Sequence, residues 1–168
     1  MALILQASDF ESGEVKVGYN DLTQTDFETY FSDAKQTKWI YEIMGKAEGD
    51  LFIADITSYE PQTAKWITIF NELNFEVGNC TYYTGGIKKI LEYLAYHDYV
   101  NDQSIFNTPA GNKSVKAEAS DREGLIKKSC ILFNRAVDYT HVLRYYMQEN
   151  SSDYPNLEQQ TLPYSSVI

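Results

Sequence analysis

The sequence has few of the residues on which several common protein classes depend. Its two cysteines, Cys80 and Cys130, are too few for the disulfide framework of a small secreted domain. We expect two reduced thiols and a reducing compartment, with a single bridge as the alternative. The first residues lack the basic segment of a signal peptide, and charges interrupt every apolar run. The sequence therefore predicts neither a secretion signal nor a membrane-spanning helix.

Basic residues and histidines are also scarce. Lys and Arg number 14 against 24 Asp and Glu, which gives a formal net charge of −10 over 168 residues. A surface of this sign does not bind a phosphate backbone over its whole area, because that binding needs clustered cations. Neither His97 nor His141 has a second histidine four residues away or a Cys-x-x-Cys pair nearby. We therefore expect no metal site.

No sequence pattern predicts a catalytic or cofactor site. Cys130 and His141 would lie about 16 Å apart along one helix, too far for a nucleophile and its base. Thr84-Gly85-Gly86 lacks the spacing of a nucleotide-binding loop, so we expect a helix cap with a close packing contact there. The prediction is a protein without catalytic residues, cofactor or metal.

Charge and tyrosine are unevenly distributed. Residues 1–60 hold 12 acids and 4 bases, whereas residues 111–150 hold 5 acids and 7 bases. This polarity favours head-to-tail association of copies or docking onto a charged partner, with a solvated surface as the alternative. The 14 tyrosines, many near predicted helix ends, suit either a protein interface or the edge of a core.

Helical periodicity, in contrast, is abundant. It predicts a mainly α fold, a bundle of about four helices plus a short one, with one domain over 1–150 and an extended tail over 151–168. Capping boxes at Thr25–Glu28 and Ser120–Glu123 predict helices that end near Met44 and Gln148. We also expect an extended N-terminal arm over 1–20, a short amphipathic piece over 46–57, helices over 61–73 and 85–100, and connections over 75–83 and 101–119.

Two of these segments suggest contacts with other chains. The last predicted helix carries two adjacent apolar stripes, one including Leu125 and Leu143 and the other Ile126 and Val137. Such a helix is either central in its bundle or covered by a neighbouring subunit. The connection over 101–119, which has room for a β-hairpin, is long for a compact domain, and such loops are usually functional or disordered.

A series of short segments resembles, in its order along the chain, the sequences of a known protein family. They are the Met-Ala-Leu-Ile start with Asp9-Phe10, then Glu14-Val15-Lys16-Val17, Ile43-Met44-Gly45, Asp50-Leu51-Phe52-Ile53-Ala54-Asp55, Gly86-Ile87-Lys88-Lys89-Ile90-Leu91-Glu92-Tyr93, Asn107-Thr108-Pro109-Ala110-Gly111, Phe133-Asn134-Arg135-Ala136-Val137 and Asn150-Ser151-Ser152-Asp153-Tyr154-Pro155. In this order the chain resembles, over nearly its whole length, the head–tail connector (neck) proteins of tailed phages infecting Bacteroidetes, including crAss-like phages.

The resemblance implies a structural virion protein, assembled in the host cytoplasm, and not an enzyme. Such proteins form homo-oligomeric rings, typically twelve-fold, that dock beneath the portal protein, meet adjacent neck or tail rings and extend the DNA channel. DNA would pass without specific binding, and no membrane is implied. The loop and the tail would be the contact arms, and the residues singled out are Asn107, Pro109, Gly111, Lys113, Lys116, Arg122, Tyr154, Pro155 and Leu157.

Two other functions remain open at this point. An acidic protein can mimic DNA and inhibit a nucleic-acid enzyme, although the bases from Lys113 to Lys128 argue against this reading. A small regulatory or enzymatic helical domain is the other, with His97 and its neighbouring tyrosines as the first place to look.

Overall fold

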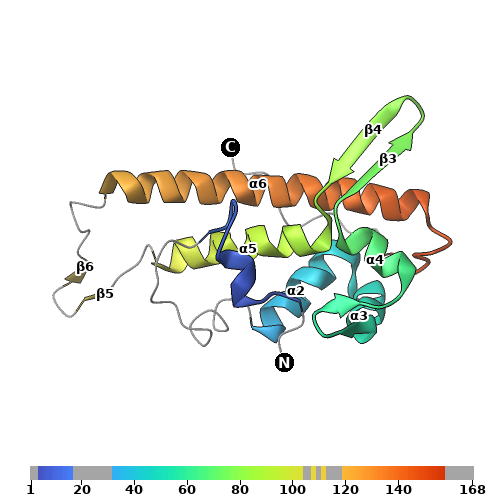
Figure 1. Ribbon diagram of the computed structural model, residues 1–168, viewed down its shortest axis with the longest axis horizontal. Helices are drawn as coiled ribbons and strands as arrows, with labels where there is room; N and C mark the ends of the chain where they lie inside the picture. Colours follow the sequence, from blue (N-terminus) through green and yellow to red (C-terminus); the bar gives the residue numbers. More distant parts are fainter. Residues whose placement is uncertain (1–3, 17–31, 104–106, 109–110, 113–118, 158–168) are drawn as a thin grey trace.

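The computed structural model describes residues 4–16, 32–103, 107–108, 111–112 and 119–157, and the fold is mainly helical, as predicted. Its long axis is formed by α5 (Gly86–Gln103) and α6 (Ala119–Glu149), which run side by side (Figure 1). The 31 residues of α6 span roughly 46 Å at 1.5 Å per residue. This helix therefore reaches across nearly the whole described structure.

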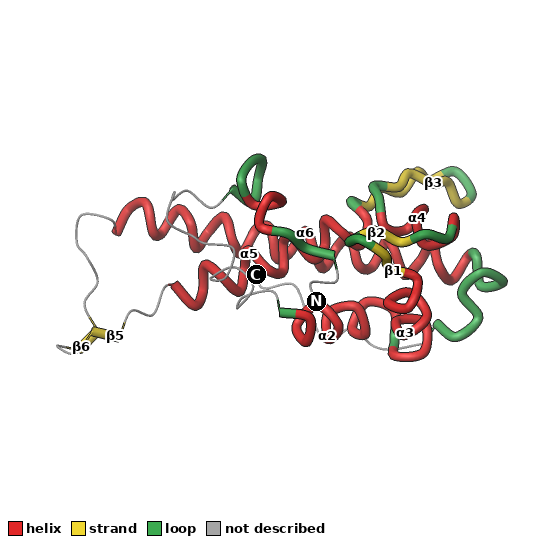
Figure 2. The backbone as a smooth tube through the Cα atoms, turned by 60° about the horizontal axis from the view of Figure 1, so that its bottom comes forward, coloured by secondary structure: helices red, strands yellow, loops and turns green. Residues whose placement is uncertain are grey.

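Three shorter helices cluster at the end of the pair where α5 begins. They are α2 (Asp33–Met44), α3 (Lys46–Asp55) and α4 (Ala64–Phe70), and Figure 2 shows α2 and α3 on one side of the long pair. Gly45 ends α2 with φ +82°, as its position in the sequence predicts, and α3 begins at the next residue. The predicted content of about four helices plus a short one matches the five α-helices of the described residues.

The N-terminal arm is folded onto this body. Residues 7–10 form a short 3₁₀ helix, η1 (Ala7–Phe10), so the described residues 4–16 are not the extended arm that was predicted over 1–20. Residues 1–3 and 17–20 of that prediction lie outside the described residues. The fully buried side-chain oxygen of Gln36 accepts hydrogen bonds from the backbone N–H groups of Ile4 and Leu5, at 3.0 and 3.1 Å. Because Ile4 and Leu5 are themselves fully buried, the arm forms part of the core.

Residues 56–63 differ from the prediction that a helix begins at Pro61. It pairs with Ile56 in a two-residue hairpin of β1 (Ile56–Thr57) and β2 (Glu60–Pro61). A carboxylate oxygen of Asp55 accepts hydrogen bonds from the N–H groups of Gln62 and Thr63 at 2.7 and 2.8 Å. These bonds hold the chain in a turn, so α4 starts only at Ala64 and ends at Phe70.

The predicted connection over 75–83 is instead a β-hairpin. Strands β3 (Leu73–Val77) and β4 (Cys80–Thr84) pair in antiparallel register, with Phe75 opposite Tyr82, and the hairpin projects from the body beside α6 (Figure 1). Side chains alternate between its two faces, and one face packs against α6. The alternation was present in the sequence, but neighbouring helical patterns obscured it.

One side of α6 is covered by the rest of the chain. Leu132, Ala136, Leu143 and Met147 are buried against the core, whose other members come from every α-helix and from the N-terminal arm. The helix starts at Ala119, one residue before the capping box that was expected to precede it. No helix among the described residues combines the length and the apolarity needed to cross a membrane.

Candidate interaction surfaces

His97, the first place to look for activity, is held as a structural histidine. Its Nε2 accepts a hydrogen bond from the Asn101 side-chain amide at 2.9 Å, so Nδ1 carries the proton and donates to Ser129 Oγ, also at 2.9 Å. Burial lowers the pKa of His97, which favours this neutral form. A base that donates to a serine does not activate it as a nucleophile, and Ser129 is fully buried.

The Thr84-Gly85-Gly86 turn is a packed helix start, as interpreted from the sequence. Thr84 Oγ1 accepts from the N–H of Gly86 at 3.3 Å and donates to the Tyr139 carbonyl at 3.2 Å. Gly86 has φ +75°, and a Cβ there would stand 2.1 Å from the Asn71 carbonyl oxygen. Glycine is required by this close approach, and the buried turn has no room for a phosphate.

The two thiols are free and separate, on β4 and on α6. Within the described residues, no three His, Cys, Asp or Glu side chains gather in a way that could hold a metal ion.

The tail after α6 is anchored to the body up to Leu157, which corrects the expectation of a tail that is extended from residue 150. Tyr154 is only 2% exposed and packs against Trp66, with ring centroids 5.6 Å apart. Its hydroxyl donates to the Lys65 carbonyl at 2.9 Å, and the Lys65 ammonium donates to the Asp153 carbonyl at the same distance. Tyr154 is thus a core residue in the folded chain.

A buried carboxylate fixes the same segment from the other side. Glu48 is fully buried, and its Oε1 accepts hydrogen bonds from the backbone and side-chain nitrogens of Asn156 at 2.8 and 3.2 Å. Leu157 packs partly buried against the core, whereas Pro155 is exposed. Of the three tail residues singled out in the sequence, only Pro155 is exposed at the surface.

The residues singled out in the loop are less fully described. Asn107 and Gly111 lie in β5 (Asn107–Thr108) and β6 (Gly111–Asn112), which pair antiparallel, so the expected hairpin is present at these four residues. Pro109, Lys113 and Lys116 lie outside the described residues. Arg122 lies in the first turns of α6.

A junction that the sequence did not predict ties the N-terminal arm to α5 and α6. Glu14 accepts a hydrogen bond from the Tyr93 hydroxyl and pairs with Arg135 at 2.8 Å. The Tyr93 bond first, and then Arg135, lower the pKa of Glu14. Because 121 residues separate Glu14 from Arg135, no local pattern could have identified this pair.

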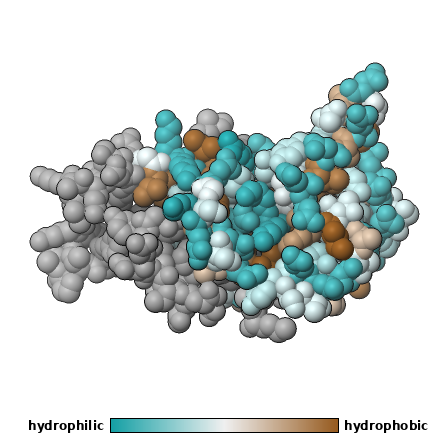
Figure 3. Space-filling view, in the orientation of Figure 1, coloured by the Kyte–Doolittle hydropathy of each residue, from teal (hydrophilic) through white to brown (hydrophobic). Residues whose placement is uncertain are grey.

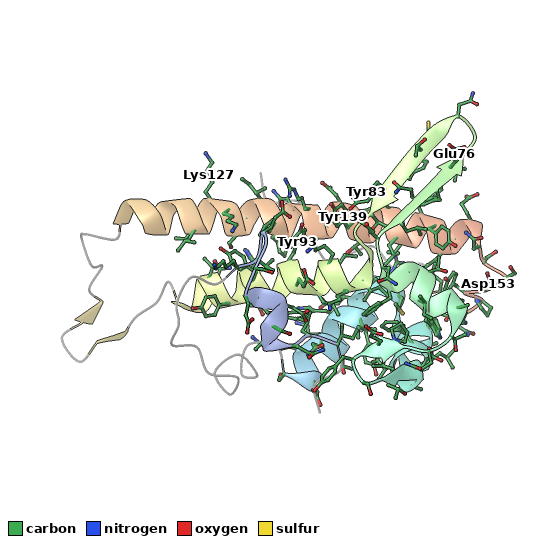
Figure 4. The ribbon with its side chains drawn as sticks, in the orientation of Figure 1. Glu76, Tyr83, Tyr93, Lys127, Tyr139 and Asp153 are labelled. Carbon is green, nitrogen blue, oxygen red and sulfur yellow. The ribbon has the colours of Figure 1, made fainter. Side chains whose placement is uncertain are left out.

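The tyrosines divide between core and surface. Tyr93, Tyr96 and Tyr154 are buried, whereas Tyr83 on the hairpin is 44% exposed and meets Tyr139 edge to face at 5.6 Å. Figure 4 shows Tyr83 and Tyr139 near the base of the projecting hairpin. The core reading therefore holds for Tyr93, Tyr96 and Tyr154, and the interface reading stays a prediction for the exposed tyrosines.

Large apolar side chains remain exposed where α6 begins. Leu125 and Ile131 are 47% exposed and Ile126 is 36% exposed. In Figure 3, brown side chains interrupt the hydrophilic surface toward the left end of the described atoms, which is the end at which α6 starts. We call residues 124–131 the basic end of α6, because this stretch also contains Lys127 and Lys128 and no acid.

The comparisons with known proteins leave the family open. No family model matches the chain, and no curated protein or solved structure matches it.

Proposed function

We propose that the protein is a structural connector of a tailed phage, a neck protein that forms a ring beneath the portal and extends the DNA channel. The ordered resemblance along the chain suggests this class. The observation that carries the proposal is that two different exposed faces, the basic end of α6 and the β3–β4 hairpin, lie far apart along one long helix. A ring needs such a pair, because each copy offers its neighbour a face unlike the one it receives.

The charge of the chain supports the same role. A conduit for DNA must not retain its cargo, and a net charge of −10 opposes binding to a phosphate backbone. The mild excess of bases over acids in residues 111–150 is too small to offset this, and it is available for contacts between proteins. In this proposal the protein acts in the virion, where its partners are copies of itself, the portal protein and adjacent rings.

The mass of the purified protein, alone and mixed with the portal protein of the same phage, tests the proposal. Light scattering and native mass spectrometry should show a ring-sized assembly that binds the portal. A strict monomer that ignores the portal would contradict the proposal.

The contribution of the tail is tested by truncation, for which the anchored segment sets the boundary. A chain that ends at Leu157 keeps Tyr154 and Asn156 in place, so it should fold normally and bind the portal less tightly. Removal of all of 151–168 would also remove Tyr154 from the core and confuse assembly with stability. Unchanged portal binding by the chain that ends at Leu157 would show that residues 158–168 are not a contact arm.

A further inference from the structure

We infer that the β3–β4 hairpin of one copy docks on the basic end of α6 of the next copy. The inference rests on the proposed ring, because it names the two surfaces that would join neighbouring copies. It is argued from the exposure, the charge and the placement of these two surfaces.

The basic end of α6 continues an apolar stripe that is buried elsewhere. Leu125 precedes Leu143 by 18 residues, about five helical turns, so both side chains lie on the same side of the helix. Leu143 is fully buried and Leu125 is 47% exposed. Apolar side chains on a core-facing stripe that the described residues leave open are typical of a surface that a partner buries.

The charges beside this stripe are available for a partner. Residues 124–135 contain three bases and no acid. Of these, Arg135 is paired with Glu14, and the Lys128 ammonium lies 5.2 Å from the centre of the Tyr96 ring. Lys127 is exposed, and no ion pair joins it to another described residue. A surface complementary to Lys127 would present a carboxylate.

The hairpin has that complementary character. Residues 66–87 contain two acids, Glu72 and Glu76, and no base. The hairpin face with Phe75 and Tyr82 packs against α6 of its own copy. Glu76 lies on the opposite face and is exposed, nearer the tip of the hairpin than Tyr83, which meets Tyr139 of α6. The sheet has only two strands, so the outer edge of each also offers unpaired backbone groups to a partner.

The two surfaces cannot meet within one copy. The hairpin packs at Tyr145, which lies 18 residues and so about 27 Å along α6 from Lys127. Figure 4 shows Glu76 on the projecting hairpin and Lys127 far along α6 from it. The occupant of the basic end is therefore the hairpin of a second copy. Such a contact between unlike faces repeats from copy to copy and closes into a ring when the rotation allows.

Exchange of the two charges tests this contact. Glu76→Lys places like charges at the interface, and so does Lys127→Glu. We expect each variant alone to raise the dissociation constant of self-association about tenfold or more. A one-to-one mixture of the two should associate as the wild type does, because every contact in an alternating assembly then joins opposite charges. Glu11→Lys and Lys46→Glu, at exposed sites elsewhere, are the matched controls and should associate normally.

The outcomes separate this inference from the proposed function. Variants that form rings as well as the wild type, or a mixture that fails to recover association, would overturn the inference and leave the connector role intact. Rings that depend on this contact but never bind the portal would support the inference and contradict the connector role. A wild type that stays monomeric with and without the portal would overturn both. Unchanged thermal unfolding of each variant checks that loss of association is not loss of fold.

Discussion

One side of α6 carries apolar residues near both ends of the helix, but the two ends have different surroundings. Leu143 and Leu125 lie on the same side of the helix, yet the first is fully buried and the second is 47% exposed. The carboxyl half of α6 contacts the hairpin through Tyr145, α2 through Arg144 and the anchored tail through Tyr146, whereas described residues leave Leu125 partly open. Periodicity therefore identifies which side of a helix is apolar, but it does not say whether the chain itself or a partner covers that side.

The largest expected effect contrasts these two leucines directly. Leu143→Ala should lower the free energy of unfolding by about 2–5 kcal/mol, because it leaves a cavity in a packed core. Leu125→Ala should change it by less than about 0.5 kcal/mol in the monomer and should weaken self-association instead. Urea unfolding of both variants measures the difference. Equal losses of stability would show that Leu125 is covered within its own chain.

The anchored tail offers a second test of the difference between the two ends of α6, because it packs against the carboxyl half of this helix. Glu48→Ala removes the acceptor of both Asn156 hydrogen bonds and should lower the free energy of unfolding by about 1–3 kcal/mol. It should also make the segment after Asn150 more sensitive to proteases. Glu60→Ala, at an exposed site, is the control and should change neither property. If Glu48→Ala left both properties unchanged, the tail would not depend on this carboxylate.

His97 of α5 packs against Ser129 and Phe133 of α6. The burial of its imidazole predicts that the stability of the fold depends on pH. The pKa of His97 is lower in the folded than in the unfolded chain, so the unfolded state binds more protons as the pH falls. Stability should therefore decrease as the pH falls below about 6.5, the ordinary histidine value, toward the folded pKa. Urea unfolding between neutral and acidic pH measures this slope.

His97→Asn tests whether His97 causes this dependence of stability on pH. His141→Asn is the control, since His141 is exposed. Loss of the buried imidazole should flatten the slope, whereas the change at His141 should leave it as in the wild type. A slope that survives in His97→Asn would assign the dependence to another group.

The smallest effect on stability is expected at the basic end itself. Lys127→Ala should change the free energy of unfolding by less than about 0.5 kcal/mol, because the side chain is exposed. Self-association should nevertheless become weaker and less sensitive to salt, because salt screens the charge pair that the variant lacks. Sedimentation at low and high salt measures both. The same salt dependence in Lys127→Ala as in the wild type would exclude this lysine from the interface.

Much of the helical frame could be predicted because its signals are local. The glycine that ends α2, the threonine that caps α5 and the apolar stripe of α6 each act within a few residues. The helix expected over 61–73 is present but shorter, Ala64–Phe70, because Asp55 holds the residues after Pro61 in a turn. The connection expected over 75–83 was wrong because its side-chain alternation is short and lies between helices.

The candidate surfaces were only partly predictable. The excess of bases over residues 111–150 and the apolar stripe that includes Leu125 were visible in the sequence, but neither pattern showed that Leu125 is exposed. The acid-bearing hairpin that could meet the basic end of α6 was not recognised, because the strands themselves were missed. Tyr154 was chosen as a contact residue, but the bonds that bury its segment join residues 88 to 108 positions apart in sequence.

Cross-linking between new cysteines at positions 81 and 124, in a chain that carries Cys80→Ser, tests the head-to-tail account most directly. Thr81 is exposed and lies directly opposite Glu76 on the same face of the hairpin, and a Cβ added at Gly124 meets nothing within 4 Å. Mild oxidation of the chain with Thr81→Cys and Gly124→Cys should give a ladder of dimers, trimers and larger species on a denaturing gel, because each copy links to two neighbours. The ladder should be absent when Gly124→Cys is left out and when it is replaced by Ala54→Cys, at an exposed site on α3. Monomers alone, or a pattern that stops at the dimer, would contradict the account.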